Sequence, residues 1–297
     1  MCGIAGYINL FGEPASPIIL RKMTDAIAHR GPDGEGFYID SCVGLGHRRL
    51  AIIDLSPAGH QPMLMPDGRY VITYNGEIYN FQELRIELEA KGHHFHSRTD
   101  TEVVLHAYSE WGEECLKRLN GMFAFAIWDR HQRELFIARD RYGIKPVYHV
   151  MRGSTLIFGS EVKAILAHPS YQCRVDRKAL LEYFTFQNIF TDRTLFEGVR
   201  LLPAGTYLRI PQGHEGRIEP RRYWDFHFSR PDDEVDDREY EEELIRLFKQ
   251  AVNRQLISDV EIGSYLSGGM DSGSIVALHA HRRRPLHDDW RSVTLSR

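Results

Sequence analysis

The sequence predicts an α+β fold followed by a second, shorter domain. In the first part, helical segments fall between strand-like segments that are close enough to form hairpins. A stretch rich in proline and glycine, ending in acidic residues, separates this part from the C-terminal part. The length of 297 residues also fits about two domains.

The expected helices of the first part have recognisable ends. Ser16 followed by Pro17 is typical of an N-cap with proline at the first helical position. Asn80 and Glu83 have the spacing of a capping box. We therefore expect helices from Pro17 until Gly31-Pro32 stops the first, from Asn80 to Gly92, and from about Asp100 to Trp111.

The expected strands lie between and after these helices. The segment Met122–Trp128 is apolar on both alternating faces, which indicates a strand buried inside a layered sandwich. The full set of expected strands is Ile4–Asn9, Val43–His47, Ala51–Asp54, Tyr70–Tyr74, Met122–Asp129, Glu134–Asp140, Val147–Met151 and Leu156–Ser160.

Composition agrees with a cytoplasmic enzyme. The hydrophobic content of 42% and charged content of 26% are near globular averages, and a net charge of −4 gives no reason to expect nucleic acid or an anionic membrane. The 4 cysteines form no C-x-x-C pair, so we expect neither zinc nor a disulfide scaffold. The sequence shows no signal-peptide pattern and no apolar run of the roughly 18 residues that a membrane span needs.

Cys2 is a candidate N-terminal nucleophile. Removal of Met1 would leave a thiol and a free α-amine on the same residue. A thiol with a pKa of about 8.5 is only slightly ionised at neutral pH, but an α-amine with a pKa of about 7.7 to 8.0 supplies some free base to activate it. The alternative is a buried, inert cysteine.

Further motifs carry residue types that suit hydrolysis of a glutamine amide: His29–Asp33, Gly46–Leu50, Asn75–Asn80 and Arg98–Glu102. With the MCGI start, they closely resemble class II (N-terminal nucleophile) glutamine amidotransferase domains from Met1 to about Trp224. The strings GHRRLAIIDLSPAGHQPM, NGEIYNFQELR, LNGMFAFAIWD and RDRYGIKPVY resemble the asparagine synthetase branch in particular. The resemblance implies a four-layer αββα sandwich.

Each of these motifs offers a residue with a chemical role. Asn75 and Gly76 suit an oxyanion site, because a side-chain amide and a glycine N–H can closely approach a reacting carbonyl. Arg49 suits the α-carboxylate of free glutamine, and Glu77 and Asp100 suit its α-ammonium. The resemblance places all five at the glutamine site, Asn75 and Gly76 included. The alternatives are a solvated arginine pair, an Asn-Gly hairpin turn and a helix N-cap at Asp100.

A second informative stretch lies near the C-terminus. Glu261–Leu266 is expected to be a strand, followed by a glycine-rich loop and a helix containing Ile275 and Leu278. Such a junction presents backbone N–H groups to an anion such as a phosphate. It is not a Walker A loop, because no G-K-[ST] follows the glycines. An ordinary serine- and glycine-rich turn is the alternative.

The loop resembles the SGGxDS pyrophosphate loop of enzymes that adenylate a carboxylate. The resemblance implies ATP as a substrate, with Mg²⁺ supplied together with ATP and no metal held by the chain's own residues. The candidate ATP and pyrophosphate ligands are Leu266, Ser267, Gly268, Gly269, Asp271 and Ser272.

These observations divide the chain into an amidotransferase domain over 1–210, a linker over 211–237 and the beginning of a synthetase domain over 238–297. The last part is expected to start a doubly wound α/β ATP-binding domain, with a further strand over Ser292–Leu295. A doubly wound sheet needs more strands than that, so the chain looks cut inside this domain.

The resemblance implies a carbon–nitrogen ligase of the asparagine synthetase type. Ammonia from the Cys2 site would amidate an aspartate that ATP has adenylated. The implied partners are glutamine, aspartate and ATP, and the resemblance is compatible with a homodimer. The alternatives are a related ligase acting on another carboxylate, a stand-alone glutaminase or sugar amidotransferase, and a non-catalytic storage or interaction protein. The glycine-rich loop argues against the second, and joint retention of Cys2, Arg49, Asn75 and Asp100 argues against the third.

Overall fold

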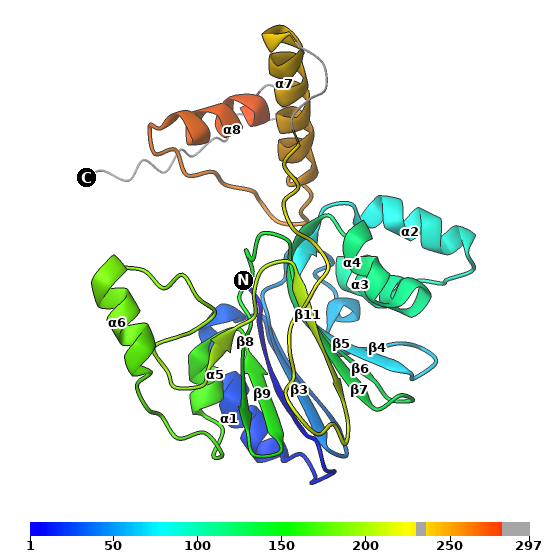
Figure 1. Ribbon diagram of the computed structural model, residues 1–297. Coiled ribbons are helices and arrows are strands. Elements are labelled where there is room, and N and C mark those ends of the chain that lie inside the picture. The colour runs from blue at the N-terminus through cyan, green and yellow to red at the C-terminus, as the bar shows by residue number, and fades with distance from the viewer. Residues whose placement is uncertain (230–235, 281–297) are drawn as a thin grey trace. The chain divides into compact units, whose positions relative to one another are not determined.

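The computed structural model describes residues 1–229 and 236–280. The chain forms two compact units, Met1–Phe226 and His227–Arg297, and each is described by itself. In the first unit, two antiparallel sheets stack face to face with helices on their outer faces (Figure 1). The N-terminus lies at one end of this stack.

The first sheet has 6 strands in the order β10-β8-β9-β1-β3-β2. Its central strand β1 is buried along its whole length. In chain order, these strands are β1 (Gly3–Asn9), β2 (Gly34–Asp40), β3 (Val43–Arg49), β8 (Tyr148–Arg152), β9 (Thr155–Gly159) and β10 (Arg200–Leu201).

The second sheet also has 6 strands, in the order β12-β11-β7-β6-β5-β4. Strands β5 and β6 pair over their full length, with Gly76 opposite Phe123. In chain order, these strands are β4 (Met63–Leu64), β5 (Tyr70–Ile78), β6 (Gly121–Asp129), β7 (Glu134–Arg139), β11 (Thr206–Pro211) and β12 (Arg221–Arg222).

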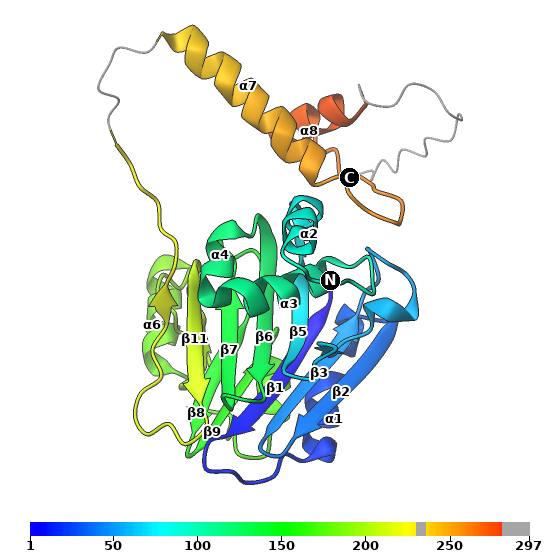
Figure 2. The same cartoon turned by 90° about the vertical axis from the view of Figure 1, so that its right-hand side faces the viewer.

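Helices cover both sheets. The α-helices of the first unit are α1 (Pro17–Asp25), α2 (Phe81–Ala90), α3 (Asp100–Trp111), α4 (Cys115–Arg118), α5 (Val162–Leu166) and α6 (Arg177–Phe186). The 3₁₀ turns are η1 (Ala28–Arg30), η2 (Pro57–Gly59) and η3 (Gly112–Glu114). Figure 2 shows α3 crossing the outer face of the second sheet.

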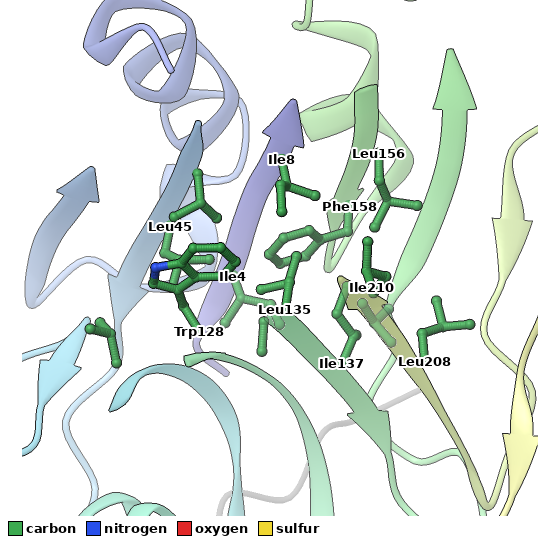
Figure 3. Close-up of a cluster of buried hydrophobic side chains, with 14 of the residues drawn as sticks. Ile4, Ile8, Leu45, Trp128, Leu135, Ile137, Leu156, Phe158, Leu208 and Ile210 are labelled. Atoms are coloured by element: carbon green, nitrogen blue, oxygen red, sulfur yellow. The ribbon is translucent and has the colours of Figure 1, made fainter. Parts of the chain in front are cut away.

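The main hydrophobic core lies between the two sheets (Figure 3). Ile4 and Phe158 from the first sheet share it with Trp128, Leu135 and Ile137 from the second. These side chains are removed from water almost completely, and each contributes roughly 1.5 to 3 kcal/mol by the hydrophobic effect. The predicted burial of Met122–Trp128 between layers is confirmed from Phe123 onward.

The outer layers have cores of their own. Leu20 and Met23 of α1 pack against the first sheet together with Ile165 of α5. On the second sheet, the ring centroids of Tyr108 from α3 and Phe136 from β7 are 4.8 Å apart. Helix, sheet, sheet and helix therefore form four layers, and the predicted αββα arrangement is confirmed.

Two predicted element ends differ from the structure. The first α-helix ends at Asp25 and is followed by η1, before the predicted stop at Gly31-Pro32. Its predicted N-cap is present, with Ile19 N–H donating to Ser16 Oγ at 3.5 Å. The predicted capping box at Asn80 is wrong. The Asn80 side chain instead donates to the Arg118 carbonyl and accepts from Asn120 N–H, so it connects α2 to the segment before β6.

The predicted strand Ala51–Asp54 is also wrong, because this segment is an irregular loop that lines a cavity. Conversely, β5 continues beyond Tyr74 to Ile78. Asn75 and Gly76 therefore lie inside a strand, which excludes the hairpin-turn alternative for this pair. The first unit also extends to Phe226, past the expected domain end at 210, because β12 pairs with β11.

The described part of the second unit contains α7 (Asp237–Arg254) and α8 (Met270–Ala280). The predicted helix after the glycine-rich loop is confirmed. The predicted strand Glu261–Leu266 is wrong: within residues 236–280 this segment has no strand to pair with, and an unpaired strand has no ladder hydrogen bonds. The strand expected over Ser292–Leu295 lies outside the described residues, and the doubly wound sheet stays a prediction.

Candidate active site

A cavity of about 390 Å³ opens at the N-terminal end of the first unit. It brings together every residue that the sequence predicted for the glutamine site, although these residues come from separate elements. Those six are Cys2, Arg49, Asn75, Gly76, Glu77 and Asp100. The other lining residues are Met1, Leu50, Ala51, Ile52, Ile53, Gly59, Tyr74, Thr99, Thr101, Met122, Ile144 and Lys145.

Cys2 precedes β1 and sits partly buried in the cavity wall. Its Sγ accepts a hydrogen bond from Leu50 N–H at 3.3 Å. Burial raises the pKa of the Cys2 thiol, whereas the Leu50 N–H and the terminal ammonium oppose this rise. Arg30 Nε donates to the Cys2 carbonyl at 2.9 Å and so fixes the backbone of the nucleophile. Met1 precedes Cys2 in this chain, and burial lowers the pKa of its terminal amine.

The exposed edge of β5 supplies a backbone donor. Alternate residues of a strand direct N–H and C=O to the same edge, here Tyr74, Gly76 and Ile78. Gln61 Oε1 accepts the Tyr74 N–H at 2.7 Å and Asp100 Oδ2 accepts the Ile78 N–H at 2.9 Å. Strand β4 pairs with β5 only up to Ile72, so no strand covers this edge at Gly76. The Gly76 N–H therefore points toward the cavity between two satisfied neighbours.

Asn75 and Gly76 combine the features of an oxyanion site. The Asn75 side chain is 1% exposed, and its Nδ2 has no hydrogen-bond partner within the part of the chain that the structure describes. A buried donor without a partner costs about 1 to 3 kcal/mol, which a bound acceptor would offset. A Cβ at position 76 would lie 2.4 Å from the Met122 carbonyl oxygen, so only glycine fits beside β6.

The two carboxylates of the cavity differ in their partners. Asp100 begins α3 and accepts from the Tyr74 hydroxyl at 2.7 Å as well as from Ile78. The N-cap of α3 is Thr99, not Asp100. Burial raises the pKa of Asp100 and also that of Glu77. Within the described ranges, no hydrogen bond or ion pair to the Glu77 carboxylate is found, which leaves Glu77 as the freer acceptor.

Arg49 ends β3 and holds the loop that forms one cavity wall. Its guanidinium donates to the Asp54 carbonyl and, at 3.0 Å, to the Ser56 carbonyl. The guanidinium packs directly against Gly59, where a Cβ would displace it. A guanidinium has five N–H donors, so these contacts do not exhaust its capacity to bind a carboxylate.

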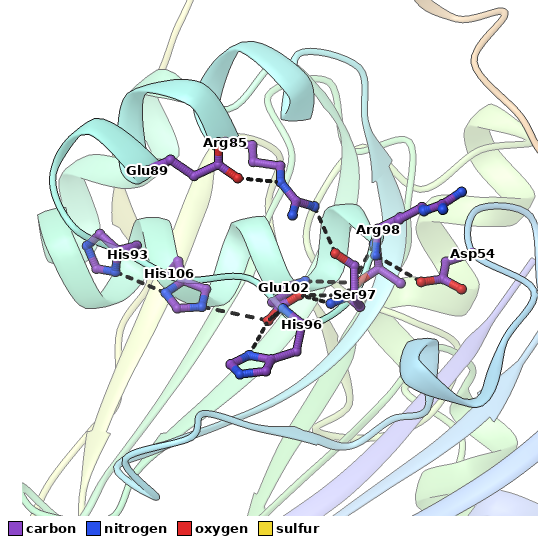
Figure 4. Close-up of polar contacts among 10 residues, drawn as sticks. Asp54, Arg85, Glu89, His93, His96, Ser97, Arg98, Glu102 and His106 are labelled. Atoms are coloured by element: carbon purple, nitrogen blue, oxygen red, sulfur yellow. Dashed lines mark hydrogen bonds and ion pairs between the residues drawn. The ribbon is translucent and has the colours of Figure 1, made fainter.

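A polar network holds the first turns of α3 and the segment before it (Figure 4). Glu102 accepts from His96 N–H at 2.8 Å and from Ser97 N–H at 2.7 Å. Burial would raise the pKa of Glu102, but the His106 ring, with Nε2 3.9 Å from Glu102 Oε1, and the hydrogen bonds from Ser97 and His96 lower it to about 2. Arg98 N–H donates to Asp54 Oδ2 at 2.9 Å, which ties the start of α3 to the Arg49 loop.

Sequence reasoning missed Lys145, a buried residue that lines the cavity. The RDRYGIKPVY string was identified only as part of a resemblance, and no role was predicted for its lysine. Burial lowers the pKa of Lys145, with Glu77 and Cys2 acting in the opposite direction. The apolar wall formed by Leu50–Ile53 was missed as well, because that segment was predicted to be a strand.

The second unit contains the glycine-rich loop before α8. Gly268 has a φ of +82°, which glycine adopts readily. Ser272 Oγ accepts from Ser267 N–H at 3.2 Å and donates to the Gly269 carbonyl at 3.1 Å. The loop therefore curls over the N-terminus of α8, the geometry that suits an anion. Leu266 is 64% exposed, and the other predicted ligands of this loop are exposed except Ser272, which is half-buried.

Asp271 is the acidic residue in the first turn of α8. Within residues 1–229 and 236–280, no group of three or more metal-binding side chains is found. No helix among the described residues is long and apolar enough to cross a membrane.

The first unit has the architecture of an N-terminal nucleophile amidotransferase: two stacked antiparallel sheets between helices, with a cysteine at the start of the chain in the cavity wall. The chain belongs to the glutamine amidotransferase domain family, whose sequence profile matches residues 1–224. The asparagine synthase profile matches residues 243–292.

Curated relatives extend the likeness into the second unit. Asparagine synthetase [glutamine-hydrolyzing] 3 of Bacillus subtilis is 41% identical over 97% of this chain and 47% of its own length. Amidase chry2 of Gibberella zeae is 36% identical over 95% of this chain and 43% of its own. The chain thus spans about half the length of these relatives.

A solved structure supports the fold. The glutamine phosphoribosylpyrophosphate amidotransferase of B. subtilis has a TM-score of 0.57 with 18% identity, over 94% of this chain and 64% of that chain. At this identity the likeness concerns the fold alone.

Proposed function

We propose that the first unit hydrolyses the side-chain amide of glutamine after Met1 has been removed. The observation that carries this proposal is the convergence in one cavity of Cys2, the unpartnered Asn75 amide and the Gly76 N–H. These groups supply a nucleophile and two donors for a developing oxyanion.

The proposed reaction begins when Cys2 Sγ attacks the amide carbon of glutamine and its proton passes to the α-amine of the same residue. The carbonyl oxygen then carries negative charge, which the Asn75 and Gly76 donors stabilise. The amine returns the proton to the leaving nitrogen, the carbon–nitrogen bond breaks, and ammonia departs. Water then cleaves the thioester to glutamate and restores the thiol.

Recognition of free glutamine follows from the charged lining. Arg49 is proposed to hold the α-carboxylate with its remaining N–H donors. Glu77, whose carboxylate has no direct partner among the described residues, is proposed to hold the α-ammonium together with Asp100. Asp100 already accepts two hydrogen bonds, so we assign the larger share to Glu77.

For the whole protein we propose asparagine synthesis. ATP would adenylate the aspartate side-chain carboxylate and release pyrophosphate, and ammonia would then displace AMP to give asparagine. The match to the asparagine synthase profile and the relative from B. subtilis support this reaction. The proposed phosphate ligands are Leu266, Ser267, Gly268, Gly269, Asp271 and Ser272, with Mg²⁺ accompanying ATP. A cytoplasmic homodimer stays a prediction.

A related ligase that amidates another carboxylate is the second candidate. Amidase chry2 supports this candidate, because a protein named as an amidase, and not as an asparagine synthetase, is 36% identical over 95% of this chain. A longer form of the protein that contains a complete synthetase domain can be assayed with aspartate and with other carboxylates. Aspartate-dependent release of AMP and pyrophosphate would decide for asparagine synthesis.

The test of the glutaminase is glutamate release by protein whose N-terminus is shown by mass spectrometry to be Cys2. We expect Cys2→Ala to abolish this release and Cys173→Ala, a change at an exposed cysteine, to preserve it. Substantial glutamine hydrolysis by Cys2→Ala would overturn the proposal. In a form with a complete synthetase domain, Cys2→Ala should retain synthesis from free ammonia.

A further inference from the structure

Lys145 is a buried cation that the proposed reaction has not yet used. It lies beyond the end of β7, is 4% exposed and lines the cavity that contains Cys2 and Glu77. Among the residues that the structure describes, its ammonium has neither a hydrogen bond nor an ion pair. An unpaired buried charge is costly, and a lysine at a surface would normally extend its ammonium into water.

The backbone around Lys145 is firmly held by one carboxylate. Asp140 is fully buried and accepts from Ile144 N–H at 2.9 Å and from Lys145 N–H at 2.9 Å. The same carboxylate accepts from Phe123 N–H of β6 at 3.1 Å. Since Phe123 lies opposite Gly76, Asp140 ties the lysine loop to the strand pair that carries the oxyanion donors.

A second side chain closes the loop from the other direction. Arg139 Nε donates to the Lys145 carbonyl at 2.8 Å, and Arg139 Nη1 donates to the Leu202 carbonyl at 2.6 Å. Gly143 turns the chain with a φ of +65° and packs against the same guanidinium. The loop is therefore rigid at its backbone and presents one unpaired cation to the cavity.

We propose that Lys145 is a positioning residue of the Cys2 site, whose ammonium stabilises the thiolate that attacks the substrate. This inference rests on the proposed glutaminase function. An opposite charge close to a thiolate favours the ionised form, and the low-dielectric cavity strengthens the interaction. The proton that leaves Sγ still goes to the α-amine, so no further reactant is needed.

The other charged groups around the cavity also affect the ionisation of the Cys2 thiol. Burial raises the pKa of the Cys2 thiol and Asp100 adds to this rise, whereas Lys145 and the Met1 amine lower the pKa. Burial lowers the pKa of the Met1 amine, and Lys145 acts in the same direction. Glu77, Asp140 and Arg30 are the remaining charged groups facing the lysine. Lys145 thus counters the two effects, burial and Asp100, that suppress the thiolate.

The experiment measures the rate of Cys2 alkylation by iodoacetamide as a function of pH, followed by mass spectrometry of the N-terminal peptide. We expect Lys145→Met to react about tenfold more slowly at neutral pH, with the pH profile displaced upward, since tenfold is the effect of one charge interaction of ordinary size. At high pH, where the thiol is ionised without help, the two rates should converge. Lys145→Arg keeps the charge and should react more nearly like the wild type.

Lys117→Met is the matched control, because it removes a lysine that is paired with Glu114 at the surface. Its alkylation profile should superimpose on that of the wild type. Lys145→Met should also fold with an unchanged or higher Tm, since an unpaired buried charge has been removed. This melting measurement separates an electrostatic effect from a loss of structure.

A profile for Lys145→Met that superimposes on the wild type would overturn the inference. If that variant also had a raised KM for glutamine, Lys145 would bind the substrate and not the thiolate. Failure of the glutaminase proposal would look different: the wild type would release no glutamate, whatever its alkylation profile.

Discussion

The two candidate sites of this chain are built in different ways. In the first unit, the groups around the cavity are held from behind by buried partners, as Tyr74 and Ile78 hold Asp100. In the described part of the second unit, the hydrogen bonds at the glycine-rich loop connect Ser267, Gly269 and Ser272 to one another. Ser267 and Gly269 are exposed, and Ser272 is half-buried. The glutamine site and the glycine-rich loop therefore differ in preorganisation. Among the described residues, only the glutamine site has buried partners that hold its groups in place.

The largest effect should come from moving the amine away from the nucleophile. An N-terminal extension leaves the Cys2 thiol in the chain but removes the free α-amine that acts as base. We expect glutamine hydrolysis to fall by about 10² to 10⁴-fold, the usual contribution of a positioned general base. Glutamate release before and after proteolytic removal of the extension measures it. Equal activity of the two forms would show that the amine has no role.

Loss of an oxyanion donor should lower kcat, and loss of the Arg49 guanidinium should raise KM. Asn75→Ala removes a donor used more strongly in the transition state, so kcat should fall by about 10² to 10³-fold. Arg49→Ala should chiefly raise KM, by about 10 to 100-fold, the size of a hydrogen bond to a charged group.

Steady-state kinetics with glutamine separates these two effects. Asn80→Ala is the control for the amide change, because the Asn80 side chain bonds to backbone groups of Arg118 and Asn120 instead. An Asn75→Ala protein with unchanged kcat would contradict the oxyanion role.

The first unit should be sensitive to acid because two buried histidines are held neutral. Burial lowers the pKa of His47 to about 3 and that of His168 to about 4. Both titrate near 6.5 in the unfolded chain, so below that pH the unfolded state binds more protons and stability falls, until about pH 4 for His168 and about pH 3 for His47. By pH 4.5 the two histidines together would cost about 5 kcal/mol.

Denaturant unfolding between pH 7 and 4.5 measures this loss. His168→Gln cannot take up the proton and should reduce the loss of stability in acid. His94→Gln, at an exposed position, should leave the slope unchanged. Stability that does not fall between pH 6.5 and 4.5 would show that these two histidines are not held neutral.

Two glycines offer a direct contrast between the sites. Gly76→Ala would place a Cβ 2.4 Å from the Met122 carbonyl and should destabilise the first unit by about 1 to 3 kcal/mol. A Cβ at position 268 would meet open space, but the φ of +82° costs alanine roughly 1 kcal/mol. This destabilisation should affect only the loop. Chemical denaturation and glutamate release should therefore respond to the first change and not to the second. Equal effects would contradict the difference in scaffolding.

The composition of the glutamine site could be predicted from sequence because each residue lies in a distinctive motif. Asn75 and Arg49 were identified by residue type, and the structure brings them into one cavity. Lys145 could not be assigned in this way, since its place in the cavity depends on Asp140 connecting its loop to β6. That contact is a product of long-range strand register, which local sequence does not reveal.

Errors in predicted secondary structure have equally specific causes. The segment Ala51–Asp54 has strand-like residues, but Arg49 captures the carbonyl of Asp54 and shapes the segment into a loop. Glu261–Leu266 also has the composition of a strand, yet a strand forms only beside a neighbour, and none pairs with it in residues 236–280. In both cases tertiary contacts decide what local propensity leaves open.

The most direct test of the central claim is covalent labelling with a reactive glutamine analogue, such as a chloroketone that carries the glutamine α-amino and α-carboxyl groups. The account predicts one adduct, at Cys2, that excess glutamine suppresses and that Asn75→Ala still forms. The exposed Cys173 provides an internal comparison, because it should react with iodoacetamide but not selectively with the analogue. Labelling at Cys173 in preference to Cys2, or labelling of Cys2 that glutamine does not suppress, would contradict the assignment of this cavity as a glutamine site.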